Sequence, residues 1–150
     1  MKFLRTAILN WAKARKPDFI IGGHDAPYLL RWWLIPRNRF FNVYVHLFLR
    51  SDDDRAEHTH PWMNCSWLIQ GNYTEWQKGV PFLRKADDIV FRRSGHMQHR
   101  VELTDGPCWT VFFTGPRYKD WHFVCPQGLV HWKDFVDARD SGAVGRGCDQ

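Results

Sequence analysis

Residues 99–116 read HRVELTDGPCWTVFFTGP, and this stretch decides the predicted fold. Two short apolar segments, 99–103 and 109–114, are separated by the turn sequence Asp-Gly-Pro at 105–107. A second turn sequence, Gly-Pro at 115–116, ends the latter segment. Short segments rich in β-branched and aromatic residues and bounded by Gly and Pro are typical of β-strands. The stretch therefore predicts two strands joined by a turn.

Similar segments recur on both sides of this stretch. They cover residues 28–35, 41–49, 65–69, 72–77, 89–92 and 122–125. Between them lie turn sequences at Gly71, Gly79-Val80-Pro81, Asp87-Asp88 and Ser94-Gly95. Many short strands at nearly even spacing are typical of an all-β sandwich or barrel. We expect a barrel core over residues 28–126.

The two ends of the chain differ from this pattern. Residues 3–12 carry apolar side chains at helical spacing before Lys16-Pro17, which predicts an N-terminal helix packed on the outside of the barrel. Residues 129–137 predict a short C-terminal helix, and residues 138–150 a loose tail. The chain shows no internal repeat and no linker. We therefore expect a single domain over residues 1–150.

Composition excludes several classes of protein. The chain has 150 residues, of which 44% are hydrophobic and 16% aromatic, and such a chain buries a core of its own. The longest apolar stretch, around residues 40–49, is much shorter than the ~20 residues of a membrane span. The basic residues near the N-terminus leave no apolar core for a signal peptide, so we expect a cytoplasmic protein without membrane association.

Cysteine spacing and net charge add little about function. Cys65, Cys108, Cys125 and Cys148 form no CxxC pair, and we expect reduced, mostly buried thiols. The formal net charge of +5 is typical of a mildly basic surface and is compatible with an anionic ligand. Nucleic acid is disfavoured as a partner but is left open.

Three of the eight histidines form an informative pattern. In an extended chain, residues i and i+2 point to the same face, so His58-Thr59-His60 places two imidazoles side by side. His99 begins a predicted strand about forty residues later, a separation that allows it to pair alongside them. Two polar histidines at a sheet edge are the alternative interpretation. The combination favours a three-histidine metal site.

These motifs resemble those of the cupin superfamily, whose members are small jelly-roll barrels, or double-stranded β-helices, that hold a divalent metal. His58, His60 and Gly71 match the first cupin motif, while Gly95 and His99 approximate the second. The resemblance spans about residues 40–115. The flanking segments are also similar to small uncharacterised cupin-like proteins of phage and bacterial genomes. This narrower likeness implies no particular reaction.

The resemblance implies a metal centre, but the chain departs from the family pattern in several places. In the second motif Asp87 replaces the first glycine, Arg93 replaces the proline, and His99 falls one residue late. Where the family has a glutamate ligand, this chain has Asn64 or Cys65. A centre of three histidines resembles that of the thiol-dioxygenase cupins and suits Fe(II), with zinc, nickel, manganese or cobalt as alternatives. His96 is the first candidate for an additional metal ligand, followed by Glu57, Glu102 or Cys65.

Basic and aromatic residues near the second motif suggest how a ligand is held. Arg92, Arg93 and Arg100 are candidates for a guanidinium clamp on a carboxylate or phosphate. A solvated basic strand edge is the alternative. Trp62 is a candidate for a flat apolar wall beside the ligand.

The sequence is compatible with three functions. The leading hypothesis is a metal-dependent enzyme, either an Fe(II) dioxygenase or an isomerase that uses the ion as a Lewis acid. The alternative is a non-catalytic module that binds a small anion or nucleotide, in a phage–host setting. A third interpretation is a self-associating β protein. A homodimer is compatible with all three functions.

Overall fold

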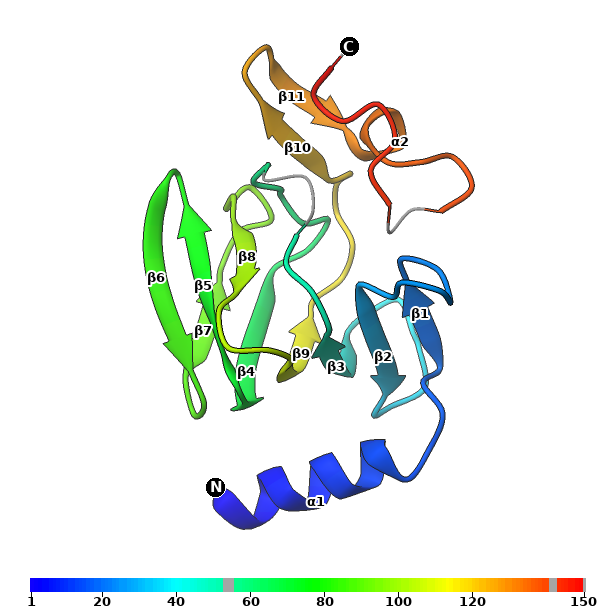
Figure 1. Cartoon of the computed structure of the whole chain (residues 1–150), viewed down its shortest axis with the longest axis vertical. Helices are drawn as coiled ribbons and strands as arrows, with labels where there is room; N and C mark the ends of the chain where they lie inside the picture. Colours follow the sequence, from blue (N-terminus) through cyan, green and yellow to red (C-terminus); the bar gives the residue numbers. More distant parts are fainter. Residues whose placement is uncertain (53–55, 141–142, 150) are drawn as a thin grey trace.

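Figure 1 shows the computed structural model of the chain, which describes residues 1–52, 56–140 and 143–149. Strands predominate, as the sequence predicts. The helices are α1 (Lys2–Lys13) and α2 (Trp132–Phe135). The strands are β1 (Phe19–Ile21), β2 (Leu29–Trp33), β3 (Asn42–Phe48), β4 (Asn64–Gln70), β5 (Asn72–Gln77), β6 (Val80–Lys85), β7 (Ile89–Arg92), β8 (Arg100–Leu103), β9 (Cys108–Thr114), β10 (His122–Cys125) and β11 (Gly128–His131).

The strands form two facing sheets and a hairpin. The larger sheet has the order β1-β2-β3-β9-β4-β7, and the smaller has the order β6-β5-β8. Neighbouring strands in both sheets run antiparallel. Figure 1 shows the β10–β11 hairpin at the end of the barrel opposite α1. The prediction of a mainly β barrel with an N-terminal helix and a short C-terminal helix is confirmed.

Period-two alternation divides the larger sheet into two faces. Trp32, Val45, Trp109 and Val111 point outward and form a core with Ala12 of α1. The apolar stripe of α1 that the sequence predicts is the surface that covers this face. The alternating side chains, which include Arg31, His46 and Phe112, line an internal cavity. The helix therefore seals one side of the sheet and leaves the other side for a ligand.

The strands β1 and β6 were not predicted from the sequence: β1 leads directly into Gly22-Gly23, and β6 begins within the predicted turn Gly79-Val80-Pro81. β1 includes Ile20-Ile21, and it pairs with β2 through residues 29–31. β6 begins at Val80-Pro81 directly after a tight turn in which Lys78 and Gly79 both have positive φ. Pro81 is tolerated because β6 is an edge strand of its sheet, where a missing backbone donor is least costly. Both strands were missed because a turn sequence extends into each of them.

The C-terminal region differs most from expectation. The predicted helix over 129–137 is wrong in its first part, because Gly128–His131 pairs with β10 as β11 and only Trp132–Phe135 is helical. The expectation of reduced thiols is wrong for two cysteines, since Cys125 and Cys148 form a disulfide. Cys65 and Cys108 are free. The disulfide links the chain after residue 143 to the hairpin, although a loose tail was expected there.

No helix among the described residues is both long and apolar enough to cross a membrane.

The disulfide predicts a measurable contribution to stability. Replacement of Cys148 by Ser should lower the free energy of unfolding by about 2–4 kcal/mol, because the crosslink restricts the unfolded chain. Denaturant titration under non-reducing conditions measures this difference. Cys65→Ser is the matched control, since Cys65 is a free thiol and its loss should change stability little. Four titratable thiols in the denatured, unreduced wild-type protein would contradict the assignment.

Candidate metal centre and its cavity

His58 and His60 lie in an extended segment between β3 and β4. The His58 backbone N–H donates to the His99 carbonyl at 2.9 Å, and the His99 N–H donates back to the His58 carbonyl at 3.1 Å. Between the two histidines, Thr59 faces the other way, and its Oγ1 accepts from the His122 N–H at 2.9 Å. The i, i+2 geometry expected from the sequence therefore holds, and backbone pairing brings His99 beside both rings.

The three imidazoles converge on one point. Their ring centroids are 4.8 to 5.1 Å apart, and one nitrogen from each lies within 4.8 Å of the others. Nε2 of His60 is 2.6 Å from Nε2 of His99. Among the described residues, this is the one group of three or more potential metal ligands.

A glycine in the second motif makes this approach of the chains sterically feasible. The His60 N–H donates to the Gly95 carbonyl at 3.0 Å. A Cβ atom on Gly95 would lie 2.3 Å from the His60 carbonyl oxygen, well inside van der Waals contact. Gly95 therefore allows the turn before His99 to pack against the segment that carries His60.

Burial keeps the three imidazoles neutral. It lowers the pKa of His58 and His60, and it lowers the pKa of His99 to about 3, with the Arg92 charge acting in the same direction on each. Neutral imidazole has a lone pair available for a cation, whereas imidazolium does not. The cluster therefore presents the protonation state that metal binding requires.

A buried carboxylate lies beside the Nδ1 atom of His99. Glu75 of β5 is completely buried, and its Oε1 lies 3.0 Å from His99 Nδ1. Burial alone would raise the pKa of Glu75, but the close polar contact with His99 and the charge of Arg92 hold it below its usual value. An ionised carboxylate at Nδ1 fixes the ring so that Nε2 faces the cluster.

Sequence reasoning missed Glu75 because it sought the acidic residue at Asn64 or Cys65. The available signal was an acidic side chain at the centre of the predicted strand 72–77. It shares a face with Tyr73, which is also buried. A charged residue at an inward position of a strand indicates a specific partner.

Arg92 lines the cavity, but its guanidinium is already engaged. It forms an ion pair with Glu75, and its Nη1 donates to Asn64 Oδ1 and Ser66 Oγ, each at 3.0 Å. Only 1% of the Arg92 side chain is exposed. The predicted clamp residue therefore serves as the counter-ion of Glu75.

The other predicted ligand-binding residues occupy different places. Arg93 is exposed, and Arg100 packs over the Trp76 ring at 5.1 Å beside Glu102. His96 is exposed, with its Nδ1 3.2 Å from Lys119 Nζ. None of these three is among the described residues that line the cavity, whereas Trp62 is.

The remaining candidates for a fourth ligand are also engaged elsewhere. Glu57 accepts hydrogen bonds from the backbone N–H groups of Lys78 and Gly79, each at 2.7 Å. Glu102 accepts from Trp76 Nε1 at 2.6 Å. Cys65 lies on the outward face of β4, where its neighbours across the strands are Phe91 and Phe113.

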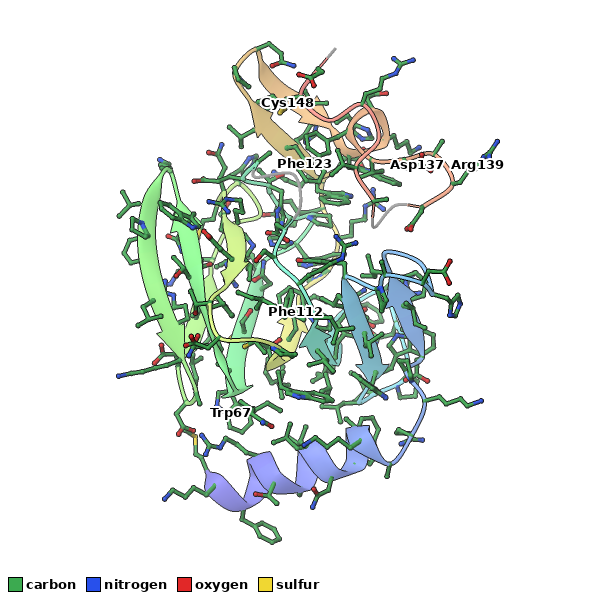
Figure 2. All side chains as sticks on the ribbon, in the orientation of Figure 1. Trp67, Phe112, Phe123, Asp137, Arg139 and Cys148 are labelled. Carbon is green, nitrogen blue, oxygen red and sulfur yellow. A yellow bond between two sulfur atoms is a disulfide. The ribbon has the colours of Figure 1, made fainter. Side chains whose placement is uncertain are left out.

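The three histidines open onto a cavity of about 350 Å³. Its walls are mostly aromatic and aliphatic, and they include Phe48, Phe112, Trp121 and Phe123. Figure 2 shows Phe112 in the middle of the barrel and Phe123 at the base of the hairpin. Such a volume lies near the small end of the range for ligand sites, roughly 300–1,000 Å³. The site is therefore suited to a small and largely apolar molecule.

Comparisons with known proteins give a fold but no close relative. No family profile and no curated protein sequence matches the chain. Among solved structures, an uncharacterised double-stranded β-helix protein from Klebsiella pneumoniae is similar with a TM-score of 0.53 and 18% identity, over 69% of this chain and 90% of that one. A RmlC-like cupin from Shewanella frigidimarina has a TM-score of 0.50 and 17% identity, over 67% and 86%.

A third similar structure is the DMSP lyase DddQ from Ruegeria pomeroyi, with a TM-score of 0.50 and 19% identity. The match covers 67% of this chain and 54% of that protein, so the chain matches about half the length of the lyase. The likeness to phage proteins stays a prediction. Agreement in fold across these structures shows that the chain has the double-stranded β-helix fold of the cupin superfamily.

Proposed function

We propose that this protein is a metal-dependent enzyme that acts on a small molecule, with His58, His60 and His99 as the metal ligands. One observation carries the proposal: three neutral imidazoles converge at the wall of a cavity of about 350 Å³. Structural histidines in a core have no need to present three ring nitrogens to one another. An ion shared between these nitrogens accounts for their arrangement.

The donor set suits a divalent transition metal. Three imidazoles without a carboxylate fit Fe(II), our first choice, as well as zinc, nickel, manganese or cobalt. Such an ion supplies Lewis acidity, and iron additionally supplies redox chemistry toward dioxygen. An Fe(II) dioxygenase is accordingly the specific activity that we propose to test first.

The chain's own groups would hold the site and limit access of water. Glu75 fixes the tautomer and orientation of His99. Asp52 Oδ2 lies 3.9 Å from His58 Nδ1, and its Oδ1 accepts a short hydrogen bond from the Tyr28 hydroxyl. The apolar side chains of Phe123 and Val144 line the cavity and would reduce the solvation of a bound ligand.

A non-catalytic binding module is the second candidate, and one observation favours it. The two carboxylates nearest the histidines are both engaged: Glu75 pairs with Arg92, while Asp52 accepts from Tyr28 and from the Val101 N–H. The described residues therefore place no uncommitted carboxylate base at the centre. In this reading the barrel holds a small anion or a nucleotide.

Compartment and assembly remain predictions. Cytoplasm was expected from the sequence, but the Cys125–Cys148 disulfide is a type of bond that a reducing cytoplasm disfavours. A homodimer remains compatible with the exposed Phe91 and Phe113 on the outer face of the larger sheet.

Alanine substitution of each ligand tests the metal centre. His58→Ala, His60→Ala and His99→Ala should each weaken metal affinity by more than the ~10–100-fold that loss of an outer-shell partner costs. Elemental analysis after anaerobic reconstitution with Fe(II) or Zn(II) measures bound metal, and circular dichroism checks folding. His96→Ala is the matched control and should retain the metal, because His96 is exposed and lies against Lys119. A folded wild-type protein that takes up no metal would overturn the proposal.

Substitution of the buried carboxylate tests its positioning role. Glu75→Gln keeps the shape but leaves Arg92 and Arg84 without their shared anion, so we expect a destabilisation of about 3–5 kcal/mol. Metal affinity should fall roughly 10–100-fold because His99 loses its orienting partner. Denaturant unfolding and metal titration measure the two effects. Glu102→Gln, on the neighbouring strand, should change both little, and unchanged metal affinity in folded Glu75→Gln would exclude the role.

Oxygen uptake separates the enzyme from the binding module. The Fe(II)-reconstituted protein should consume dioxygen with at least one member of a panel of small acids and thiols, and the His58→Ala/His60→Ala variant should not. An oxygen electrode measures the rate. Ligand binding without oxygen uptake or chemical conversion across the panel would favour the binding module.

A further inference from the structure

Arg31 is a cation in the cavity that the clamp predicted from the sequence did not include. It lies on β2, and its side chain lines the same cavity as the three histidines. Its Nε donates to His46 Nε2 at 2.8 Å, and its guanidinium lies over the Tyr44 ring, 4.7 Å from the centroid. The hydrogen bond to His46 fixes one nitrogen of the guanidinium, and the Tyr44 ring covers one of its faces.

The charge of Arg31 lacks a counter-ion among the residues that the structure describes. Arg92 and Arg84 both pair with Glu75, but none of the carboxylates in residues 1–52, 56–140 and 143–149 is paired with Arg31. His46 cannot compensate, because burial and the neighbouring Arg31 charge keep its pKa well below the usual value and leave it neutral. Burial also lowers the pKa of Arg31 to about 10, so the guanidinium remains charged at pH 7. A partly buried cation without a counter-ion favours the binding of an anion, which would compensate its charge.

An aromatic wall connects Arg31 with the histidine cluster. His46 stacks on Phe112 with ring centroids 5.1 Å apart, and Phe112 is 6.1 Å from His60. Phe112 lies in the middle of the barrel in Figure 2. A ligand that reaches both the cluster and Arg31 must therefore pass over an apolar surface.

We propose that the cavity binds a monocarboxylate with a short apolar body, whose carboxylate pairs with Arg31 and whose other end faces the three histidines. The orientation of the far end rests on the proposed function, whereas the carboxylate subsite does not. The planar guanidinium fork matches a carboxylate. One uncompensated cation in apolar surroundings favours a monoanion over a phosphate dianion. Since a water molecule takes up about 30 Å³ in the liquid, the cavity of about 350 Å³ suits roughly a dozen non-hydrogen atoms.

Three probes of similar shape test the subsite in chelator-treated protein. They are 3-phenylpropanoate, its neutral amide, and 2-phenylethyl phosphate at pH 8, where it is a dianion. Calorimetric titration should show the carboxylate binding at least about tenfold more tightly than the amide, because only the carboxylate forms a charged hydrogen bond with Arg31. The phosphate should also bind more weakly than the carboxylate. Comparable binding of the amide, tighter binding of the phosphate, or no carboxylate binding would overturn the proposal.

Substitution of Arg31 tests whether this residue causes the preference for the carboxylate over the amide. In Arg31→Met the preference for carboxylate over amide should disappear, with affinity for the amide retained. Arg100→Met is the matched control and should keep the preference, because Arg100 packs over Trp76 away from the cavity. A retained preference in Arg31→Met would exclude Arg31. If Arg31→Met does not fold, the comparison of probes on the wild-type protein still decides whether the cavity selects a monocarboxylate.

Metal titration of the same wild-type sample, without any probe, tests the proposed function separately. Carboxylate selectivity without metal uptake would leave the Arg31 subsite standing and remove the metal centre. Metal uptake without carboxylate selectivity would support the metal centre and remove the Arg31 subsite.

Discussion

The ion pair between Glu75 and Arg92 joins the two sheets of the barrel. Glu75 belongs to β5 of the smaller sheet and Arg92 to β7 of the larger one, so their bond crosses the interior. Arg84 of β6 and His99, just before β8, meet the same carboxylate. A buried carboxylate with this many partners is stable only when all of them are in place. The position of His99 is therefore coupled to the correct assembly of both sheets.

The same network sets the electrostatics of the cavity. Glu75 neutralises Arg92, which would otherwise be the strongest cation beside the histidines. The imidazoles stay neutral mainly because they are buried, and the other arginine among the described residues that line the cavity is Arg31. Two arginines at inward positions have different roles because Arg92 pairs with a carboxylate on the neighbouring sheet, whereas Arg31 contacts the neutral His46 and the Tyr44 ring. Charge compensation distinguishes a structural arginine from one available for binding.

Local patterns predicted much of this molecule, and long-range contacts account for what they missed. Alternation and turn sequences indicated most strands, and the spacing of His58 and His60 placed both rings on one face. The strands at residues 19–21 and 80–85 each begin or end in a turn sequence, so pairing rather than propensity forms them. The Cys125–Cys148 bond and the contact of Glu75 with His99 each join distant segments. Neither contact can be inferred from the spacing of residues that are close together in the sequence.

Adjacent residues on β2 show how the fold separates stability from recognition. Trp32 packs outward, stacked on Trp109 beneath α1, whereas Arg31 points into the cavity. A shift of one residue in the register of β2 would exchange the two, burying a charge under the helix and placing an indole in the ligand site. The apolar core between α1 and the sheet therefore fixes which side chains face the ligand. Substitutions on the inner face can change what is bound while this core, and with it the register, remains intact.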